Sequence, residues 1–359
     1  MPGVFDPLTI RGVTLRNRIG ISPMCQYSSE DGHATDWHVV HLGSRAQGGA
    51  GLVHVEATAV EARGRITPGD MGIWQDSHIA PLARVAKFVK SYGAVPAIQI
   101  AHAGRKGSTA APWAGGASLA DADGGYETVA PSALPFGGNI TRVPRTLAAE
   151  EIGGIAEAFG RAAERALAAG FEWIEFHAAH GYLTHQFLSP LSNTRNDEYG
   201  GSFDNRIRFC LQAVRAIRGA WPERLPMAIR LSCTDWLPGG WDIEQTVELA
   251  RRLKGEGVDI VDCSSAGLRA DQQPARGPGF QVPFAEAVRK GAGIATAAVG
   301  GIVAPSHADE IVRNGRADLV LVARQSLRDP YFARNAALAL GAGDKARLPI
   351  QYHHYVGAG

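Results

Sequence analysis

The sequence predicts an α/β fold, a single closed (β/α)₈ TIM barrel, with a doubly wound parallel sheet as the alternative. Eight short runs rich in Val, Ile and Ala recur along the chain, and such runs are typical of buried parallel strands. Amphipathic stretches lie between them, and strands that alternate with helices indicate βαβ units. The 359 residues match a barrel of roughly 250 residues with insertions.

The expected strands, in chain order, are 18–24, 51–60, 95–102, 171–177, 226–232, 258–265, 294–301 and 317–324. Two intervening stretches, EEIGGIAEAFGRAAERALAAG and IEQTVELARRLKGEG, are apolar at helical spacing and end in glycine, as helices do. We therefore expect a helix after each strand and one domain over residues 1–359.

The surplus length is concentrated after the third expected strand. Residues 103–146 are rich in Gly and Pro and have no clear periodicity, so we expect a long insertion there that acts as a lid or binding excursion. Residues 183–203 and 266–282 are expected to be smaller insertions, and residues 341–359 a C-terminal tail.

Composition excludes several classes of protein. A formal charge of +1 without a dense Lys/Arg block argues against nucleic-acid binding. No apolar run approaches the roughly 18 to 20 residues of a membrane span, and no signal pattern begins the chain, so a cytoplasmic protein is expected. The four cysteines, Cys25, Cys210, Cys233 and Cys263, form no CxxC pair, which argues against a disulfide framework, a structural zinc site and an iron–sulfur cluster.

Polar side chains stand where the expected strands end. In a barrel these ends form one rim, where active sites are built. The rim is predicted to hold Cys25, Tyr27, Glu56, Ala57, Gln99, His102, His177, His180, Tyr182, Arg230, Gly300, Gly301, Ala323 and Arg324. Each has an innocent interpretation: Arg230 alone could be a core arginine paired with an acid, and Cys25 a small buried hydrophobe. Their joint placement favours a site.

The loops after the last two strands favour a phosphorylated ligand. Barrel enzymes often bind phosphate there, through backbone N–H groups. Gly300 and Gly301 allow a ligand to approach the backbone closely, and Arg324 can donate two hydrogen bonds to phosphate oxygens. Plain turn glycines are the alternative.

With these residues assembled, the chain resembles the Old Yellow Enzyme family of FMN-dependent ene-reductases, in particular its bacterial, thermophilic-like branch. The resemblance spans nearly the whole chain. It rests on NRIGISPMCQY, WHVVHLGSRAQGGAGLVHVEATAV, IQIAHAGRK, HAAHGYL, RNDEYGGSFDNR and GRADLVLVARQSLRDP. It implies an NADPH dehydrogenase that binds FMN without a covalent bond, uses NADPH as a substrate and forms a homodimer or homotetramer.

The resemblance also implies roles for single residues. Those expected to contact FMN are Ser22, Pro23, Met24 and Cys25 at the ring, Ala57, Gln99 and Arg230 at its polar edge, and Gly300, Gly301, Ala323 and Arg324 at the phosphate. Cys25 is expected to tune the flavin potential. Tyr27, His177, His180 and Tyr182 are expected to bind substrate, with Tyr182 as the proton donor.

The chain departs from the family pattern in two places. Ala323 stands where relatives usually have glycine, which could shift the phosphate loop slightly. His353 and His354 follow Tyr352 where some relatives place an arginine that reaches a neighbouring subunit, and no arginine follows Tyr352 in this sequence.

The histidine cluster in HAAHGYLTHQFLSP, residues 177–190, has three interpretations. A metal site at His177 and His180, as in a metal-dependent barrel hydrolase, needs a further ligand such as His102, Glu56 or His185. The HxxH spacing alone is a weak signal, so no metal is expected, and packing-only histidines would need several buried partners. The remaining interpretation is a pair of N–H donors that hold the carbonyl oxygen of an activated alkene.

This interpretation gives the expected reaction. NAD(P)H reduces FMN, which then transfers hydride to the β-carbon of an enone, enal, maleimide or nitroalkene held by the His pair. Tyr182 protonates the α-carbon. Because both substrates use one site in turn, ping-pong kinetics are expected.

Overall fold

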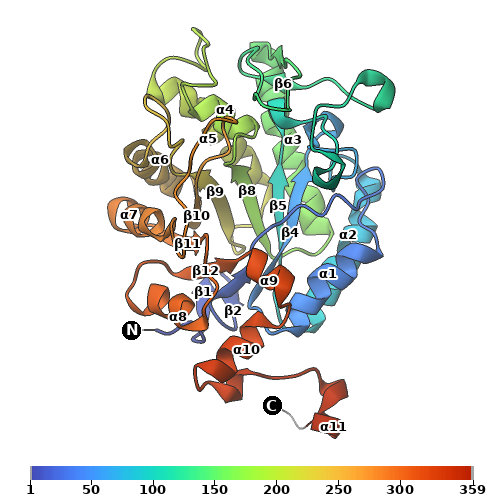
Figure 1. Ribbon diagram of the computed structural model, residues 1–359, viewed down its shortest axis with the longest axis vertical. Helices are drawn as coiled ribbons and strands as arrows, with labels where there is room; N and C mark the ends of the chain where they lie inside the picture. The colour runs from blue at the N-terminus through green and yellow to red at the C-terminus, as the bar shows by residue number, and fades with distance from the viewer. Residues whose placement is uncertain (1, 357–359) are drawn as a thin grey trace.

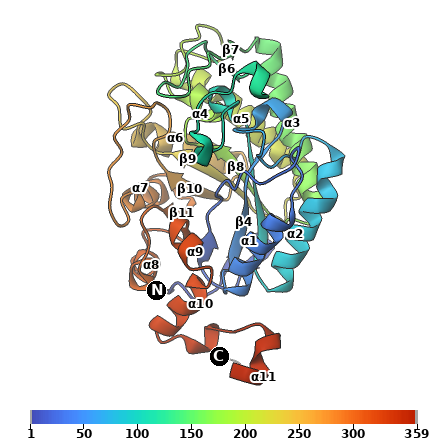
Figure 2. The ribbon, with the colours of Figure 1, turned by 45° about the vertical axis from the view of Figure 1, so that its right-hand side comes forward.

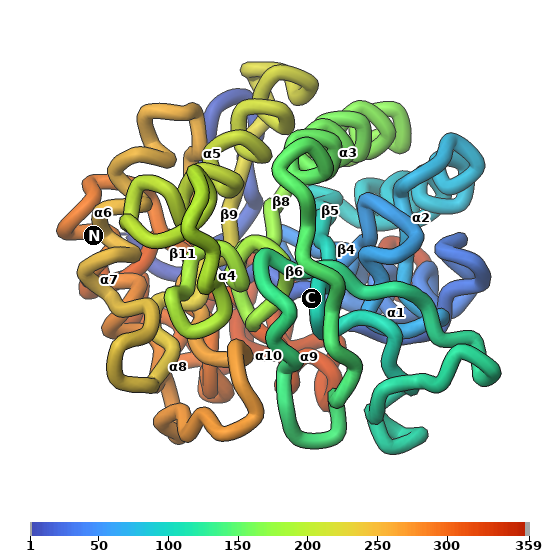
Figure 3. Tube along the Cα trace, turned by 90° about the horizontal axis from the view of Figure 1, so that it is seen from above, coloured from blue at the N-terminus to red at the C-terminus, as the bar shows by residue number. Residues whose placement is uncertain are grey.

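The computed structural model describes residues 2–356 and confirms the predicted closed barrel of eight parallel strands. Figure 3 shows the strands at the centre and the helices around them. The barrel strands are β3 (Ile19–Ile21), β4 (Leu52–Ala59), β5 (Val95–Ala101), β8 (Trp173–Ala178), β9 (Met227–Ser232), β10 (Ile260–Ser264), β11 (Ala295–Val299) and β12 (Leu319–Val322). They pair in chain order, and β12 closes on β3. A doubly wound sheet is thereby excluded.

The helices are α1 (Asp36–Gln47), α2 (Ile79–Ser91), α3 (Ala149–Ala168), α4 (Leu183–Leu188), α5 (Phe203–Ala220), α6 (Ile243–Gly255), α7 (Val282–Ala292), α8 (Pro305–Arg313), α9 (Arg324–Arg328), α10 (Phe332–Ala339) and α11 (His353–Val356). Most of the helices cover the outside of the barrel, whereas α11 lies in the C-terminal tail away from it. Among helices of the described residues, none is both long and apolar enough to cross a membrane.

The helix α6 shows how local sequence sets these elements. Asp242 caps its start, because the carboxylate accepts a hydrogen bond of 2.8 Å from the Gln245 N–H. Leu249 and Leu253, four residues apart, are fully buried against the barrel. The chain leaves the helix at Gly257, whose φ of +88° suits glycine.

The strands are buried on both faces, as parallel strands between helices must be. In β4 the pairing register with β5 shifts between Val55 and Ala57. Such a bulge turns the following side chains, and it lies where Glu56 and Ala57 reach the rim.

The remaining segments lie at the two ends of the barrel (Figures 1 and 2). A hairpin of β1 (Leu8–Ile10) and β2 (Val13–Leu15) lies at the amino-terminal end of the strands. Residues 103–146 contain the 3₁₀ turns η3 (Gly104–Lys106), η4 (Pro112–Ala114) and η5 (Asp121–Asp123) and the short strand β6 (Val129–Ala130), which pairs with β7 (Arg145–Thr146) above the barrel. The tail from residue 341 leads to α11 at the opposite end, and its residues 357–359, like Met1, lie outside the described part.

Candidate active site

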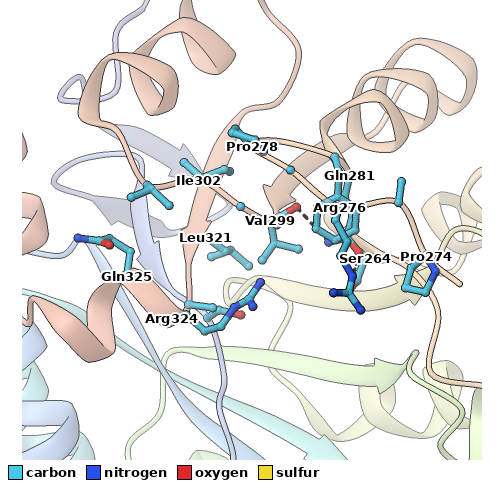
Figure 4. Close-up of a pocket in the computed structure, with 18 of the residues that line it drawn as sticks. Ser264, Pro274, Arg276, Pro278, Gln281, Val299, Ile302, Leu321, Arg324 and Gln325 are labelled. Carbon is cyan, nitrogen blue, oxygen red and sulfur yellow. Dashed lines mark hydrogen bonds between the residues drawn. The ribbon is translucent and has the colours of Figure 1, made fainter. Parts of the chain in front are cut away.

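The carboxyl ends of the strands enclose a cavity of about 870 Å³, within the range of cofactor pockets. Figure 4 shows its lining: Leu321 and Arg324 come from the end of β12, whereas Pro274, Pro278 and Gln281 come from the segment between β10 and α7. Of the predicted site residues, those that line it are Ser22, Pro23, His180, Arg230, Gly300, Gly301, Ala323 and Arg324. Together with Ser264 at the end of β10, they come from six strand ends.

Three arginines give this cavity a positive lining. Arg276, Arg324 and Arg328 face it, and none of them forms an ion pair with another described residue. The glycine pair closes the same region: a Cβ on Gly301 would lie 2.3 Å from the carbonyl oxygen of Gly277, so no side chain fits there. Unpaired guanidinium groups beside a bare backbone suit a phosphate group, as in FMN.

Arg230, on β9, is held from two sides. Its Nε lies 2.5 Å from Oδ2 of Asp262 on β10, and its Nη2 donates a 2.7 Å hydrogen bond to Oγ of Ser22. Both members of the ion pair are almost fully buried. Arg230 was expected to be either a core arginine paired with an acid or part of the site. It is both paired with an acid and part of the cavity lining.

Gln99 is buried and is not among the residues that line the cavity. Its Nε2 donates a 2.7 Å hydrogen bond to Glu175, whose other oxygen lies 3.7 Å from Nε2 of His54. Burial raises the pKa of the Glu175 carboxyl and lowers that of His54 to about 4. These buried side chains link β4, β5 and β8 inside the barrel.

The two histidines of the HAAHGY motif converge. Nε2 of His177 lies 3.3 Å from Nδ1 of His180, and Nε2 of His180 lies 2.7 Å from Oγ of Ser264 at the end of β10. The Ala179 N–H donates to Nδ1 of His177 at 3.1 Å, so His177 must carry its proton on Nε2. A neutral His177 therefore points an N–H toward the space it shares with His180.

Both rings are uncharged. Burial, followed by the positive charges of Arg230 and Lys106, holds the pKa of His177 well below its ordinary value. Burial and the neighbouring His177 do the same for His180. Histidines in this state are hydrogen-bond donors without a net charge.

Tyr182 follows the pair at the start of α4. Its ring meets that of His177 edge-on, with centroids 4.9 Å apart. Burial, and next the nearby Cys25, raises the pKa of the Tyr182 hydroxyl well above 10, so the phenol keeps its proton. The Tyr182 hydroxyl can therefore act as a proton donor.

Tyr27 and Cys25 lie in the loop after β3, with Met24 beside them. Burial raises the pKa of both the Cys25 thiol and the Tyr27 hydroxyl, so both groups are neutral. The Tyr27 ring packs edge-on against Trp113 of the 103–146 segment, with centroids 5.8 Å apart. This contact brings that segment to the edge of the site.

A second, small cavity lies behind Tyr182. It is lined by Ala57, Ala59, Gly64, Ile66, Asp70, Ala101, Ala103 and Tyr182 and leaves about 10 Å³ for the centre of a water molecule, which is about enough for one. Ala57 was predicted to contact the cofactor and Tyr182 the substrate, and both line this small cavity. Burial raises the pKa of Asp70, which also lines it, to about 7.

The conceivable metal ligands have other partners. His185 lies 2.9 Å from Asp235, His102 lies 3.3 Å from Glu61, and Glu56 lies 3.8 Å from His38. Within residues 2–356, no group of three or more His, Cys, Asp or Glu side chains is arranged to hold a metal ion. The geometry gives the hydrolase alternative no support.

Sequence reasoning missed several residues that complete the site. Ser264 ends the sixth barrel strand in the letters CSS, a polar strand end that was a usable signal. Lys106 stands in the motif IQIAHAGRK, and its Nζ donates to the backbone oxygens of His180 and Gly267. Asp262 and Arg276 carry no local signal, because only the folded barrel shows which groups they meet.

Comparison with known proteins agrees with this geometry. Residues 3–341 match the model of the NADH:flavin oxidoreductase / NADH oxidase family. The chain is 48% identical over 354 residues to an NADPH dehydrogenase of Geobacillus sp. (strain WCH70), covering 97% of each chain. It is 46% identical to an NADPH dehydrogenase of Bacillus subtilis (strain 168), covering 97% of this chain and 98% of the relative.

A solved structure supports the same assignment. Morphinone reductase in complex with tetrahydroNAD superposes with a TM-score of 0.79 at 30% identity, covering 95% of this chain and 92% of that one. The whole-length matches, the closed barrel and the arginine-lined cavity lead to one conclusion. The chain belongs to the NADH:flavin oxidoreductase / NADH oxidase family, the FMN-dependent oxidoreductases related to Old Yellow Enzyme.

Proposed function

We propose that this flavin oxidoreductase is an ene-reductase, which uses NADPH to saturate the C=C bond of an α,β-unsaturated carbonyl compound or nitroalkene. Bound FMN would supply the redox chemistry, accepting a hydride from NADPH and returning one to the β-carbon of the alkene. The chain itself would hold the substrate oxygen, supply the proton and exclude water.

The convergence of His177 and His180 is the observation that carries this proposal. The nearest nitrogens of these two neutral imidazoles are 3.3 Å apart, so both can donate to a single oxygen that lies to one side and contacts both of them. A carbonyl oxygen gains negative charge as the β-carbon is reduced, and donors fixed in advance stabilise that charge. Because neither ring is charged, the site favours a neutral carbonyl group in the ground state.

Tyr182 completes the reaction as the proton donor to the α-carbon. Its raised pKa keeps the hydroxyl protonated over the physiological range, and its ring lies against His177. The donor therefore stands next to the oxygen-binding pair, as general acid catalysis requires.

The cofactor would be held from both ends. We infer that Arg324 and the backbone of Gly300, Gly301 and Ala323 bind its phosphate, because unpaired arginines line that part of the cavity. Ser22, Pro23, Met24, Cys25, Ala57, Gln99 and Arg230 would surround its ring. Arg230, fixed by Asp262, would place a positive charge where the reduced ring carries negative charge.

The proposal is tested by measuring separately the reduction of FMN by NADPH and its reoxidation by an alkene. We expect purified enzyme loaded with FMN to be yellow, to bleach when NADPH is added without oxygen, and to regain its colour with 2-cyclohexenone. Tyr182→Phe should slow the return of colour about a hundredfold and leave the bleaching unchanged. Equal slowing of both halves would refute proton donation by Tyr182, and no return of colour in the unmodified enzyme would refute the ene-reductase function.

We also propose that the chain forms a homodimer or homotetramer. The tail after residue 341 extends away from the barrel and exposes 76% of Ile350, 44% of Tyr352 and 84% of Tyr355. Light scattering of the full chain and of a form that ends at Gly341 should give different numbers of subunits per particle. Equal numbers would show that assembly does not need the tail.

A further inference from the structure

Lys106 occupies a position that the proposed reaction has not yet used. It ends the turn η3 after β5, and its Nζ donates to the backbone oxygen of His180 at 2.8 Å and of Gly267 at 2.9 Å. The same nitrogen lies 5.0 Å from the centre of the Tyr182 ring and 4.6 Å from that of Phe136. None of the ion pairs formed within residues 2–356 involves Lys106, so its charge faces two carbonyl oxygens and two aromatic rings.

The two carbonyl groups belong to turns that touch each other. A Cβ on Gly181 would lie 2.0 Å from the oxygen of Gly267, so the turn after β8 and the turn after β10 are in backbone contact. His180 has φ +58° and Ala266 has φ +65°, which is unusual for residues with side chains. Such conformations persist where neighbouring groups hold them.

Ser232, at the end of β9, joins the same two turns from another side. Its Oγ accepts a 2.9 Å hydrogen bond from the His180 N–H and donates one of 2.8 Å to the oxygen of Ala266. The backbone of His180 is thus held at its N–H by Ser232 and at its carbonyl oxygen by Lys106. This fixed backbone aims Nδ1 of His180 at Nε2 of His177.

The position over Tyr182 gives Lys106 an electrostatic effect as well. When a phenol gives its proton to carbon, the O–H bond breaks, a C–H bond forms, and the electron pair of the O–H bond stays on the phenolate oxygen. A cation held over the ring in a water-poor site stabilises that phenolate more strongly than the neutral phenol. Proton uptake from solvent then restores the phenol.

We propose that Lys106 is a positioning residue for alkene reduction, which fixes His180 through its backbone oxygen and serves as the counter-ion of the Tyr182 phenolate. This inference rests on the proposed ene-reductase function. It predicts that Lys106 affects the step in which the alkene is reduced and has little effect on the step in which NADPH is oxidised.

The charge state of Lys106 makes the inference testable by pH. Burial, and next the charge of Arg105 in the same turn, lowers the pKa of Lys106 to about 7. Below that pH the ammonium is charged, and above it the charge is lost, so alkene reduction should slow as the pH rises from 6 to 9. Of the titratable groups around it, His177 and His180 stay neutral and Tyr182 stays protonated in this range. Asp70 also changes charge near pH 7, and a variant must separate the two.

The experiment uses the enzyme loaded with FMN and three variants. Lys106→Met removes the charge, Lys106→Arg keeps it at every pH tested, and Lys90→Met removes an exposed lysine on α2 as a control. The rate of bleaching by NADPH and the rate of reoxidation by 2-cyclohexenone are measured without oxygen from pH 6 to 9.

We expect Lys106→Met to slow reoxidation at pH 6 at least tenfold and to change bleaching less than twofold. Lys106→Arg should stay within about threefold of the unmodified enzyme at pH 6 and should lose the decline above pH 7. Lys90→Met should match the unmodified enzyme.

Three results would overturn the inference. One is reoxidation of Lys106→Met within threefold of the unmodified enzyme; another is equal slowing of both half-reactions, which a purely structural role would cause. The third is a decline above pH 7 that persists in Lys106→Arg, which would assign it to Asp70. If the unmodified enzyme is bleached by NADPH but not reoxidised by the enone, the proposed function fails, and this inference with it.

Discussion

Ser264 offers a sharp test of how the histidine pair works, because its hydroxyl is the partner of His180 on the side away from His177. Its Oγ lies 2.7 Å from Nε2 of His180. For both histidines to donate to one carbonyl oxygen, His180 must carry its proton on Nδ1. Its Nε2 is then unprotonated and needs a donor, and the Ser264 hydroxyl is that donor. Ser264→Ala should therefore weaken binding of the substrate oxygen.

The size of the effect follows from burial. Ser264 is only 5% exposed, so its removal leaves a buried ring nitrogen without a partner. An unsatisfied buried acceptor costs about 1 to 3 kcal/mol. At about 1.4 kcal/mol for each factor of ten, kcat/KM for an enone should fall by roughly five- to a hundredfold. The fall should be the same from pH 6 to 9, because His180 stays neutral throughout this range.

The assay compares Ser264→Ala with Ser265→Ala at saturating FMN. Ser265 is the matched control, since its hydroxyl donates to Oε1 of Gln281 at 2.6 Å and has no bond to His180. Steady-state rates with varied 2-cyclohexenone give kcat/KM, and the absorption spectrum gives the FMN content of each variant. Equal losses in both variants, or a loss in Ser264→Ala explained by its FMN content, would refute the assigned proton position on His180.

Three further predictions concern the cofactor and the fold. Arg230→Ala removes a cation from the cavity and leaves Asp262 unpaired, so FMN content after gel filtration should fall at least tenfold; full retention would contradict its role. Cys25→Ala should shift the flavin midpoint potential by about 20 mV, since the neutral thiol acts through interactions of about 1 kcal/mol; an unchanged potential would make Cys25 a packing residue. Asp235→Asn breaks the buried pair with His185 and should cost about 3 kcal/mol in denaturant unfolding at pH 7. The pKa of Asp235 lies below its ordinary value of about 3.8, so the unmodified protein should keep this contribution at neutral pH and lose it only as the pH falls below about 4.

The barrel was predictable from sequence because parallel strands are buried on both faces and read as apolar runs. Strand ends were less predictable. The first run continues through 18–24, but β3 stops at Ile21, because Ser22 to Cys25 leave the sheet to line the rim. Apolar residues predict burial rather than strand, and the rim residues Ser22 to Cys25 are buried or half-buried without being in the sheet.

The candidate site was predictable in part. Residues in the loops after strands stood out by type, and the structure brings His177, His180 and Tyr182 together. The acid that pairs with Arg230 could not be named, since Asp262 faces it only through the register of β9 with β10. Lys106 likewise acts through backbone oxygens far away in sequence, which no local pattern encodes.

The backbone contact between Gly181 and Gly267 sets a condition for anyone who wishes to redesign substrate preference. If either loop is exchanged for that of a relative, its new backbone must still fit against the other loop. At this contact there is no room even for a methyl group on Gly181 or Gly267. The two loops must therefore be exchanged together, along with the lysine that ties them. Libraries that vary one loop alone would mostly sample misaligned catalytic groups.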